Sequence, residues 1–197
     1  MDREYMIRLC KQGNIGAFEK LYAQSFKKAL QTAYLIIGNK TLAEDAVQET
    51  FYQCYLDIKG LKNPKAFDAW FHRILVRTCW KVAAKERKKQ HELLDENNYS
   101  QHFNFSHNQL EDKAQNMEMK VALYDAINNL SEVLRTSVIL FYFNEMSIKE
   151  IATALGCFES TVKSRLYKAR KKIEEELIKK DVIMNIEELN SLKEECV

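Results

Sequence analysis

A run of basic and hydroxyl side chains between positions 160 and 171 has the composition of a surface that binds DNA. These residues alternate with Val162, Leu166 and Ala169, which recur at the spacing of one buried helix face. The outward set is nearly free of acids and consists of Ser160, Thr161, Lys163, Ser164, Arg165, Tyr167, Lys168 and Lys171. Lysine and arginine neutralise phosphates, and polar side chains on a helix can meet base edges in the major groove. We therefore take this set as candidate contacts to duplex DNA.

A helix that binds in a DNA groove needs a second helix to position it. The residues before position 160 predict such a helix. Ile151 and Leu155 recur at helical spacing, and Ser147 with Glu150 forms a capping-box pattern at the start. Gly156 then ends the segment. Two helices joined by a short turn with glycine predict a helix-turn-helix, whose second helix enters the major groove. The alternative is an amphipathic helical hairpin with a solvated basic face.

Residues 62–89 form another basic stretch, in which Asp68 and Glu86 are the only acids. The pattern predicts a long helix over residues 67–89 with one apolar face. Its other faces combine rings and cations, namely Trp70, Arg73, Arg77, Trp80 and Lys81. This mixture suits single-stranded DNA, because cations neutralise phosphates and each ring stacks on a base for about 1–3 kcal/mol. Alternatively both tryptophans lie in the core and the cations are solvated, although we expect Trp80 to be exposed.

An acidic and amide face marks the helix predicted over residues 41–56. Thr41 is the expected N-cap. Asp45, Gln48 and Glu49 fall together on the polar side of this helix. Such a face can pair with Arg and Lys of a partner, and the alternative is a solvated helix surface with no partner.

The composition favours an all-α fold, because 197 residues include only 5 glycines and 1 proline. Asn14 is the expected cap of a core helix that ends at Gly38. No apolar run approaches the roughly 20 residues that span a bilayer. The N-terminus MDREYMIRLC lacks the layout of a signal peptide, which predicts a cytoplasmic protein.

The net charge of +2 hides two basic blocks that are separated by an acidic segment over residues 91–118. Two basic blocks on one chain predict two contacts with nucleic acid. The segment between them is polar and lacks apolar periodicity, so we expect it to be a linker.

No catalytic or metal-binding arrangement is visible in the sequence. The 5 cysteines are odd in number and none are spaced as CxxC, while His102 and His107 have no cysteine beside them. No catalytic triad, paired carboxylates or phosphate-binding glycine loop stands out. We therefore expect no catalytic residues, no metal and no cofactor, and a protein that is not an enzyme.

Several of these strings resemble one family. LSEVLRTSVILFYFNEMS, EIATALG and TVKSRLYKARKKI look like region 4 of the extracytoplasmic-function (ECF) sigma factors of the sigma-70 family. GNIGAFEKLYAQSF and AEDAVQETF are similar to region 2. The resemblance implies two small helical domains joined by a flexible linker. Region 2 would occupy residues 1–90, the acidic linker 91–116 and region 4 residues 117–180, with an acidic extension over 181–197.

The resemblance also assigns roles to residues. Region 2 binds the polymerase core and the melted −10 promoter element, and region 4 binds the −35 element. The positions that match the family's core-binding helix, which docks on the β′ clamp helices, are Asp45, Gln48, Glu49 and Phe51. The loop that captures an unstacked −10 base corresponds to Lys59, Lys62 and Asn63. The chain departs from the family at Phe158, where a small hydroxyl residue usually caps the recognition helix.

The resemblance thus implies a sigma factor that directs promoter recognition, melting and transcription initiation. Its expected partners are RNA polymerase core, through the β′ clamp helices and the β flap, and promoter DNA. An anti-sigma factor is a possible further partner, and no direct membrane insertion is expected. The alternatives are a helix-turn-helix regulator that binds duplex DNA without acting as a sigma factor, and an interaction protein whose basic faces are merely solvated.

Overall fold

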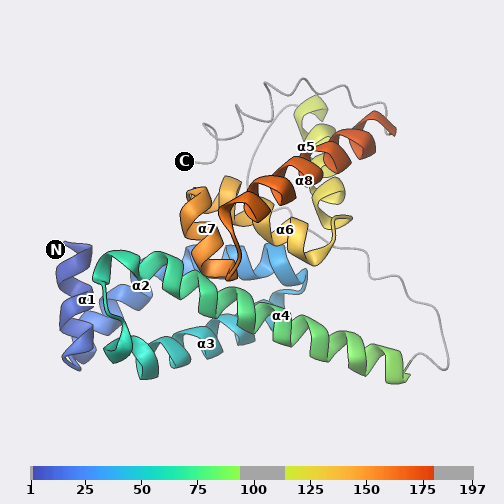
Figure 1. Cartoon of the computed structure of the whole chain (residues 1–197). Coiled ribbons are helices and arrows are strands. Elements are labelled where there is room, and N and C mark those ends of the chain that lie inside the picture. The colour runs from blue at the N-terminus through green and yellow to red at the C-terminus, as the bar shows by residue number, and fades with distance from the viewer. Residues whose placement is uncertain (1, 94–113, 180–197) are drawn as a thin grey trace.

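Every regular element in residues 2–93 and 114–179, the part of the chain that the computed structural model describes, is a helix (Figure 1). The first unit contains α1 (Arg3–Lys11), α2 (Ile15–Ile37), α3 (Lys40–Asp57) and α4 (Phe67–Leu93), with 3-10 turns at Ile58–Gly60 and Pro64–Ala66. The second unit contains α5 (Ala114–Asn128), α6 (Glu132–Val138), α7 (Ile148–Leu155) and α8 (Glu159–Lys179). A π-helical segment, Ile139–Phe143, continues α6. The prediction of an all-α fold with two small helical domains is confirmed.

The first unit begins its long helices at asparagine caps. The side chain of Asn14 accepts a hydrogen bond from the Ala17 amide at 2.9 Å, as predicted. The predicted cap at Thr41 is wrong, because Asn39 accepts from the Leu42 amide at 3.0 Å and α3 starts one residue before Thr41. Asn39 has extended backbone angles, and asparagine caps at least as well as threonine, so the helix starts at the earlier site.

Aromatic rings hold the first unit together where α2, α3 and α4 meet. Phe51 of α3 lies between Tyr22 and Phe71, with ring centroids 4.6 Å and 5.0 Å away. Phe67 stacks on Phe71 at 5.7 Å. Aromatic pairs of this kind contribute about 0.5–1.5 kcal/mol beyond their burial. These contacts fix the start of α4 against the other two helices.

The second unit is organised by the apolar stripe of α8. Val162, Leu166 and Ala169 are buried, as their spacing predicts. Through this stripe α8 packs on α5, α6 and α7. The opposite face of α8 remains exposed along most of its length.

The two units pack directly on each other. Helix α7 lies against α4, while α6 and the π-helical segment lie against α2 (Figure 1). The buried apolar side chains of both units join into one continuous cluster. One side of α4 is therefore covered by the second unit.

Two substitutions test whether Asn39 or Thr41 is the N-cap of α3. Asn39→Ala should lower the free energy of unfolding by about 1 kcal/mol, because the Leu42 amide loses its acceptor. The matched change Thr41→Ala should stay within about 0.5 kcal/mol, as expected for an exposed site. Urea unfolding followed by circular dichroism measures both, and a larger loss at Thr41 would reassign the cap.

Candidate nucleic-acid interface

The helix-turn-helix has the predicted local geometry. The Ser147 hydroxyl accepts from the Glu150 amide at 3.3 Å, and the Glu150 carboxylate accepts from the Ser147 amide at 2.8 Å. Hydrogen bonds from the side chain and backbone of Ser147 lower the pKa of Glu150. Gly156 ends α7 in the left-handed region, with a φ of +64°. The capping box and the glycine turn therefore set the angle at which α8 leaves α7.

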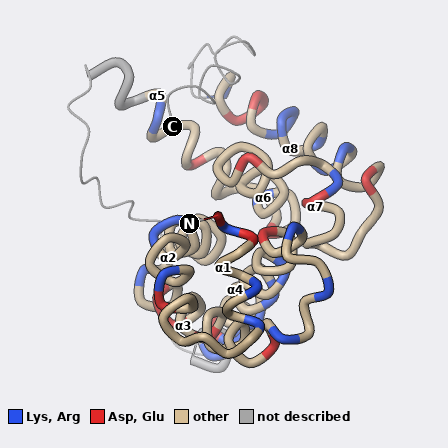
Figure 2. Tube along the Cα trace, turned by 90° about the vertical axis from the view of Figure 1, so that its left-hand side faces the viewer, with Lys and Arg blue, Asp and Glu red and all other residues tan. Residues whose placement is uncertain are grey.

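The polar face of α8 is open to solvent. The exposed members of the candidate set are Ser160, Lys163, Ser164, Tyr167, Lys168 and Lys171. Thr161 and Arg165 are half-buried, and the Arg165 guanidinium lies 3.6 Å from the Cys157 sulfur. Figure 2 shows the lysines and arginines spaced along α8 and α4. The recognition helix thus carries its cations outward while its stripe stays in the core.

A groove of about 550 Å³ runs between α8 and the start of α6. Its lining from α8 comprises Ser160, Thr161, Ser164, Arg165 and Lys168. The other wall is made by Ser131, Val133 and Leu134. This wall could not be predicted from the sequence, because its residues lie far from α8 along the chain and meet it only in the folded unit.

The recognition helix begins without a hydroxyl cap. Phe158 occupies the position before Glu159, the first residue of α8, and its carbonyl accepts from the Thr161 amide at 3.0 Å. The Phe158 side chain cannot accept a hydrogen bond and is 82% exposed. The side-chain cap that is usual in the family is therefore lost at this departure, at a cost of about 1 kcal/mol.

The cations predicted on α4 form an exposed row. Arg73, Arg77 and Lys81 are exposed and follow one another at four-residue spacing, which places them along one side of the helix. Trp70 is half-buried, with its ring 5.9 Å from that of Phe67. The row is therefore open to a ligand, while Trp70 offers only part of its ring.

The loop before α4 presents the other predicted contacts to solvent. Lys59, Lys62 and Asn63 are exposed. The Asn63 side-chain oxygen accepts from the Lys65 amide at 3.0 Å, so it also holds the turn at Pro64–Ala66. Ile58 and Leu61 are buried and anchor the loop on the first unit.

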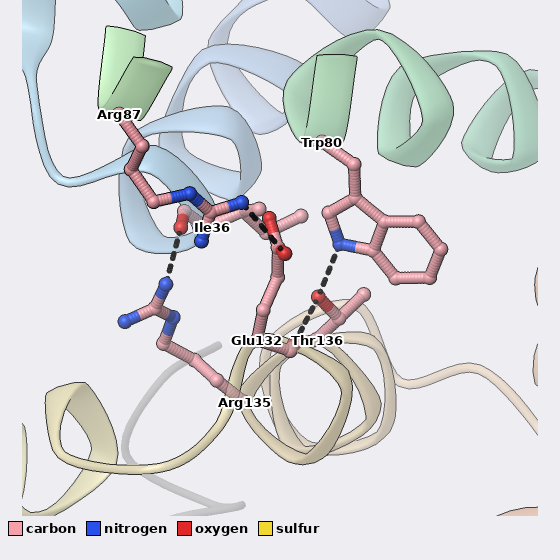
Figure 3. A network of polar contacts seen from close by, with 6 residues as sticks. All are labelled: Ile36, Trp80, Arg87, Glu132, Arg135 and Thr136. Carbon is pink, nitrogen blue, oxygen red and sulfur yellow. Dashed lines mark hydrogen bonds and ion pairs between the residues drawn. The ribbon is translucent and has the colours of Figure 1, made fainter. Parts of the chain in front are cut away.

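The expectation that Trp80 is exposed is wrong. Its ring is half-buried and packs against the core, and its indole nitrogen donates to the Thr136 hydroxyl at 3.2 Å (Figure 3). The reason is tertiary, because α6 of the second unit covers this part of α4. Its ring is therefore not free to stack on a base in this arrangement.

The acidic face of α3 is largely as predicted, with one correction. Asp45, Gln48 and Glu49 are exposed, and Glu49 accepts from Gln53 at 3.3 Å. Phe51, in contrast, is only 4% exposed and lies in the aromatic core, so its side chain cannot meet a partner.

The same face of α3 also carries an exposed aromatic side chain that we did not predict. Tyr52 is 59% exposed and follows Gln48 by four residues, which places it on the same side of α3. Tyr55 and Leu56, at the end of the helix, are also exposed.

Most of the cysteines that the structure describes are small buried residues. Burial raises the pKa of Cys54 and of Cys79 to about 12 each. Cys10 is buried as well, and Cys157 is half-exposed. Within residues 2–93 and 114–179, no group of His, Cys, Asp or Glu side chains is placed to hold a metal ion. His102 and His107 and the extension after residue 180 lie outside the described residues.

None of the described helices combines the length and the apolar character of a bilayer-spanning segment.

Two segments of the chain match known families. Residues 21–89 match sigma-70 region 2, and residues 120–173 match sigma-70 region 4. The matched segments comprise 69 and 54 of the 197 residues. The chain belongs to the sigma-70 family, as an ECF sigma factor.

It therefore acts with RNA polymerase core and promoter DNA in transcription initiation and is not itself an enzyme. The match to region 2 disfavours a helix-turn-helix regulator that does not act as a sigma factor.

Sigma factors from several bacteria are similar over most of the chain. The RNA polymerase sigma factor SigV of Bacillus subtilis is 29% identical over 150 residues, which cover 76% of this chain and 84% of SigV. The ECF RNA polymerase sigma-E factor of Haemophilus influenzae is 28% identical over 179 residues, covering 87% and 93% of the two chains.

Two solved structures share the fold. CnrH, solved in complex with the cytosolic domain of CnrY, matches with a TM-score of 0.65 at 21% identity, over 89% of this chain and 96% of CnrH. The sigma factor RpoE of Bartonella quintana, solved with the anti-sigma factor NepR, gives 0.60 at 22% identity, over 81% and 96%. At these identities the likeness concerns the fold alone.

Proposed function

We propose that the first unit of this sigma factor binds polymerase core and the −10 element, and that the second unit binds the −35 element. The observation that carries the proposal is the exposed polar face of α8 opposite its buried stripe, in a helix-turn-helix with a formed capping box. A helix presented in this way can enter the major groove, with its first turns toward the base edges.

At the −35 element, the groove between α8 and α6 supports contact with both bases and backbone. Lys163 and Ser164 on the exposed face are placed for base edges, while Lys168 on the groove wall is placed for a phosphate. Ser131, on the other wall, adds a hydroxyl donor of the kind that commonly binds phosphate oxygens.

At the −10 element, the row of Arg73, Arg77 and Lys81 provides the electrostatic track for a single strand. The exposed loop residues Lys59 and Lys62 extend the positive charge on the same unit. In this proposal Asn63 also contacts the −10 strand, through its side-chain amide.

Polymerase core binds, in this proposal, along the exposed face of α3. Asp45, Gln48 and Glu49 would meet basic and polar groups of the β′ clamp helices. Tyr52 supplies the apolar anchor that such interfaces place among polar contacts, in the role that buried Phe51 cannot fill.

Three wider parts of the proposal rest on the family. The protein acts in the cytoplasm, where polymerase core is found, and its second unit contacts the β flap. An anti-sigma factor is a further partner, which is supported by the solved complex of the sigma factor RpoE with the anti-sigma factor NepR. The domain and linker boundaries at residues 90, 116 and 180 remain predictions.

Replacement of one cation on α8 tests the duplex contact. Lys168→Ala should weaken binding to any duplex and reduce the slope of log affinity against log salt by about 1, because one phosphate contact is lost. The control Lys179→Ala changes the same residue type at the far end of the helix, where Lys179 pairs with Glu176 at 2.7 Å. Fluorescence anisotropy of the full chain over a salt series measures both. Equal slopes for Lys168→Ala and the unmodified protein would remove Lys168 from the interface.

Charge reversal on α3 tests the polymerase contact. Asp45→Arg should weaken binding to purified core by about tenfold or more, because an acidic group that meets a basic partner becomes repulsive. Glu19→Arg makes the same reversal at an exposed site on α2 and should leave core affinity nearly unchanged. Unfolding curves for both variants establish that the fold is kept. Core affinity that is unaltered by Asp45→Arg would exclude this face of α3.

A further inference from the structure

The most exposed large apolar side chain in residues 2–93 and 114–179 lies at the N-terminal end of the recognition helix. Phe158, the residue directly before α8, is 82% exposed, against 70% for Tyr167 and 65% for Ile178. The preceding residue, Cys157, packs against the apolar core, whereas Phe158 does not. Because burial of apolar surface is what a side chain of this type contributes to folding, the Phe158 ring adds little to the stability of the fold.

The same residue also gives up a stabilising contact. A Ser, Thr, Asp or Asn side chain in this position would accept a hydrogen bond from an amide of the first helical turn, and a phenylalanine side chain cannot. The amides of Thr161 and Val162 instead share the carbonyl of Phe158, at 3.0 Å and 3.2 Å. Folding therefore does not explain why an aromatic ring occupies this position.

Hydrogen bonds on both sides fix the backbone that carries the ring. Gly156 turns the chain in the left-handed region, and the Cys157 amide donates to the Ala152 carbonyl at 3.0 Å. The Phe158 carbonyl is held by the first turn of α8, as described above. The turn thus presents the ring from a backbone that is already ordered, which reduces the entropy lost when a ligand binds.

This end of α8 is poorly suited to the DNA backbone. Phe158 and Glu159 are both exposed, and the first cation of the helix, Lys163, follows Glu159 by about one turn. A phenyl ring has no hydrogen-bond donor, and a carboxylate is repelled by phosphate. Phosphates are therefore left to the cations further along the helix, such as Lys168.

Base edges are the partners that remain for this end of the helix. In a helix-turn-helix, the N-terminal residues of the recognition helix meet the base edges in the major groove. The apolar group that B-DNA presents there is the 5-methyl group of thymine, and phenylalanine is among the side chains that contact it. A cytosine in the same place would turn its amino donor toward a ring that cannot accept a hydrogen bond.

We propose that Phe158 is a specificity-determining residue that contacts the 5-methyl group of a thymine in the −35 element. The contact removes the methyl group and part of the ring from water, and it disfavours cytosine at that position. The inference rests on the −35 role proposed above for the second unit.

The test first identifies a duplex and then removes single methyl groups from it. The full chain, bound to sigma-free bacterial core polymerase, selects duplexes from a pool with a randomised segment. Each thymine of the enriched site is then replaced in turn by deoxyuridine, which lacks only the 5-methyl group. Fluorescence anisotropy measures the affinity of the same complex. One replacement should weaken binding by about fourfold, as expected for the loss of one buried methyl group.

Two variants test whether this thymine is read by Phe158. Phe158→Ser supplies the missing cap, so it should shift the folding equilibrium about fivefold towards the native state. Its affinity for the thymine duplex should fall by about fourfold or more, and deoxyuridine should then have no further effect, because ring and methyl group act as a pair. Phe158→Ala should lose the discrimination as well, which separates loss of the ring from gain of a hydroxyl. The control Ile178→Ala trims another exposed apolar side chain, at the far end of α8, and should keep the fourfold discrimination.

The other outcomes overturn the proposal in distinguishable ways. A deoxyuridine effect of the same size in Phe158→Ser and in the unmodified protein, or no sensitive thymine, would overturn it. Weaker binding of Lys168→Ala to that duplex would then leave the proposed function intact. Loss of core affinity in Phe158→Ser with unchanged duplex selection would place the ring against protein and overturn the proposal too. Failure to enrich any sequence would overturn the −35 role itself, and the inference with it.

Discussion

The structure depends on helix α4 being buried from two directions. Phe67 and Phe71 pack on one side into the aromatic core of the first unit, and His72 and Trp80 meet the second unit on another. A helix that is covered on several sides sets the positions of all its neighbours. The placement of the helix-turn-helix relative to the first unit follows from the packing of α7 on α4. The row of cations, Arg73, Arg77 and Lys81, remains exposed on α4.

Because α4 serves both units, the second unit covers part of the surface that we expected to meet promoter DNA. The cations of α4 and the polar face of α8 are available in this arrangement, whereas the Trp80 ring is not. Polymerase core, which we place on α3, is bound on a face that the second unit leaves open.

Helix types and most of the site were predictable from the sequence, because apolar periodicity reports which face of a helix is buried. Periodicity gave the stripe of α8 and the acidic face of α3, and local patterns gave the caps at Asn14 and Ser147. Periodicity does not show which other helix packs on a given face. Trp80 was misjudged because its partner Thr136 lies 56 residues away along the chain. Phe51 was misassigned because its neighbour Tyr52, about 100° around the helix, holds the exposed position.

Run-off transcription tests the central claim most directly. The purified protein is added to sigma-free bacterial core polymerase on a template that carries the region upstream of its own gene. The account predicts a discrete product that is absent without the protein and is reduced by Lys168→Ala and by Asp45→Arg, which remove its contacts with promoter and with core. A chain that binds both core and this duplex tightly, yet yields no product, would contradict the account.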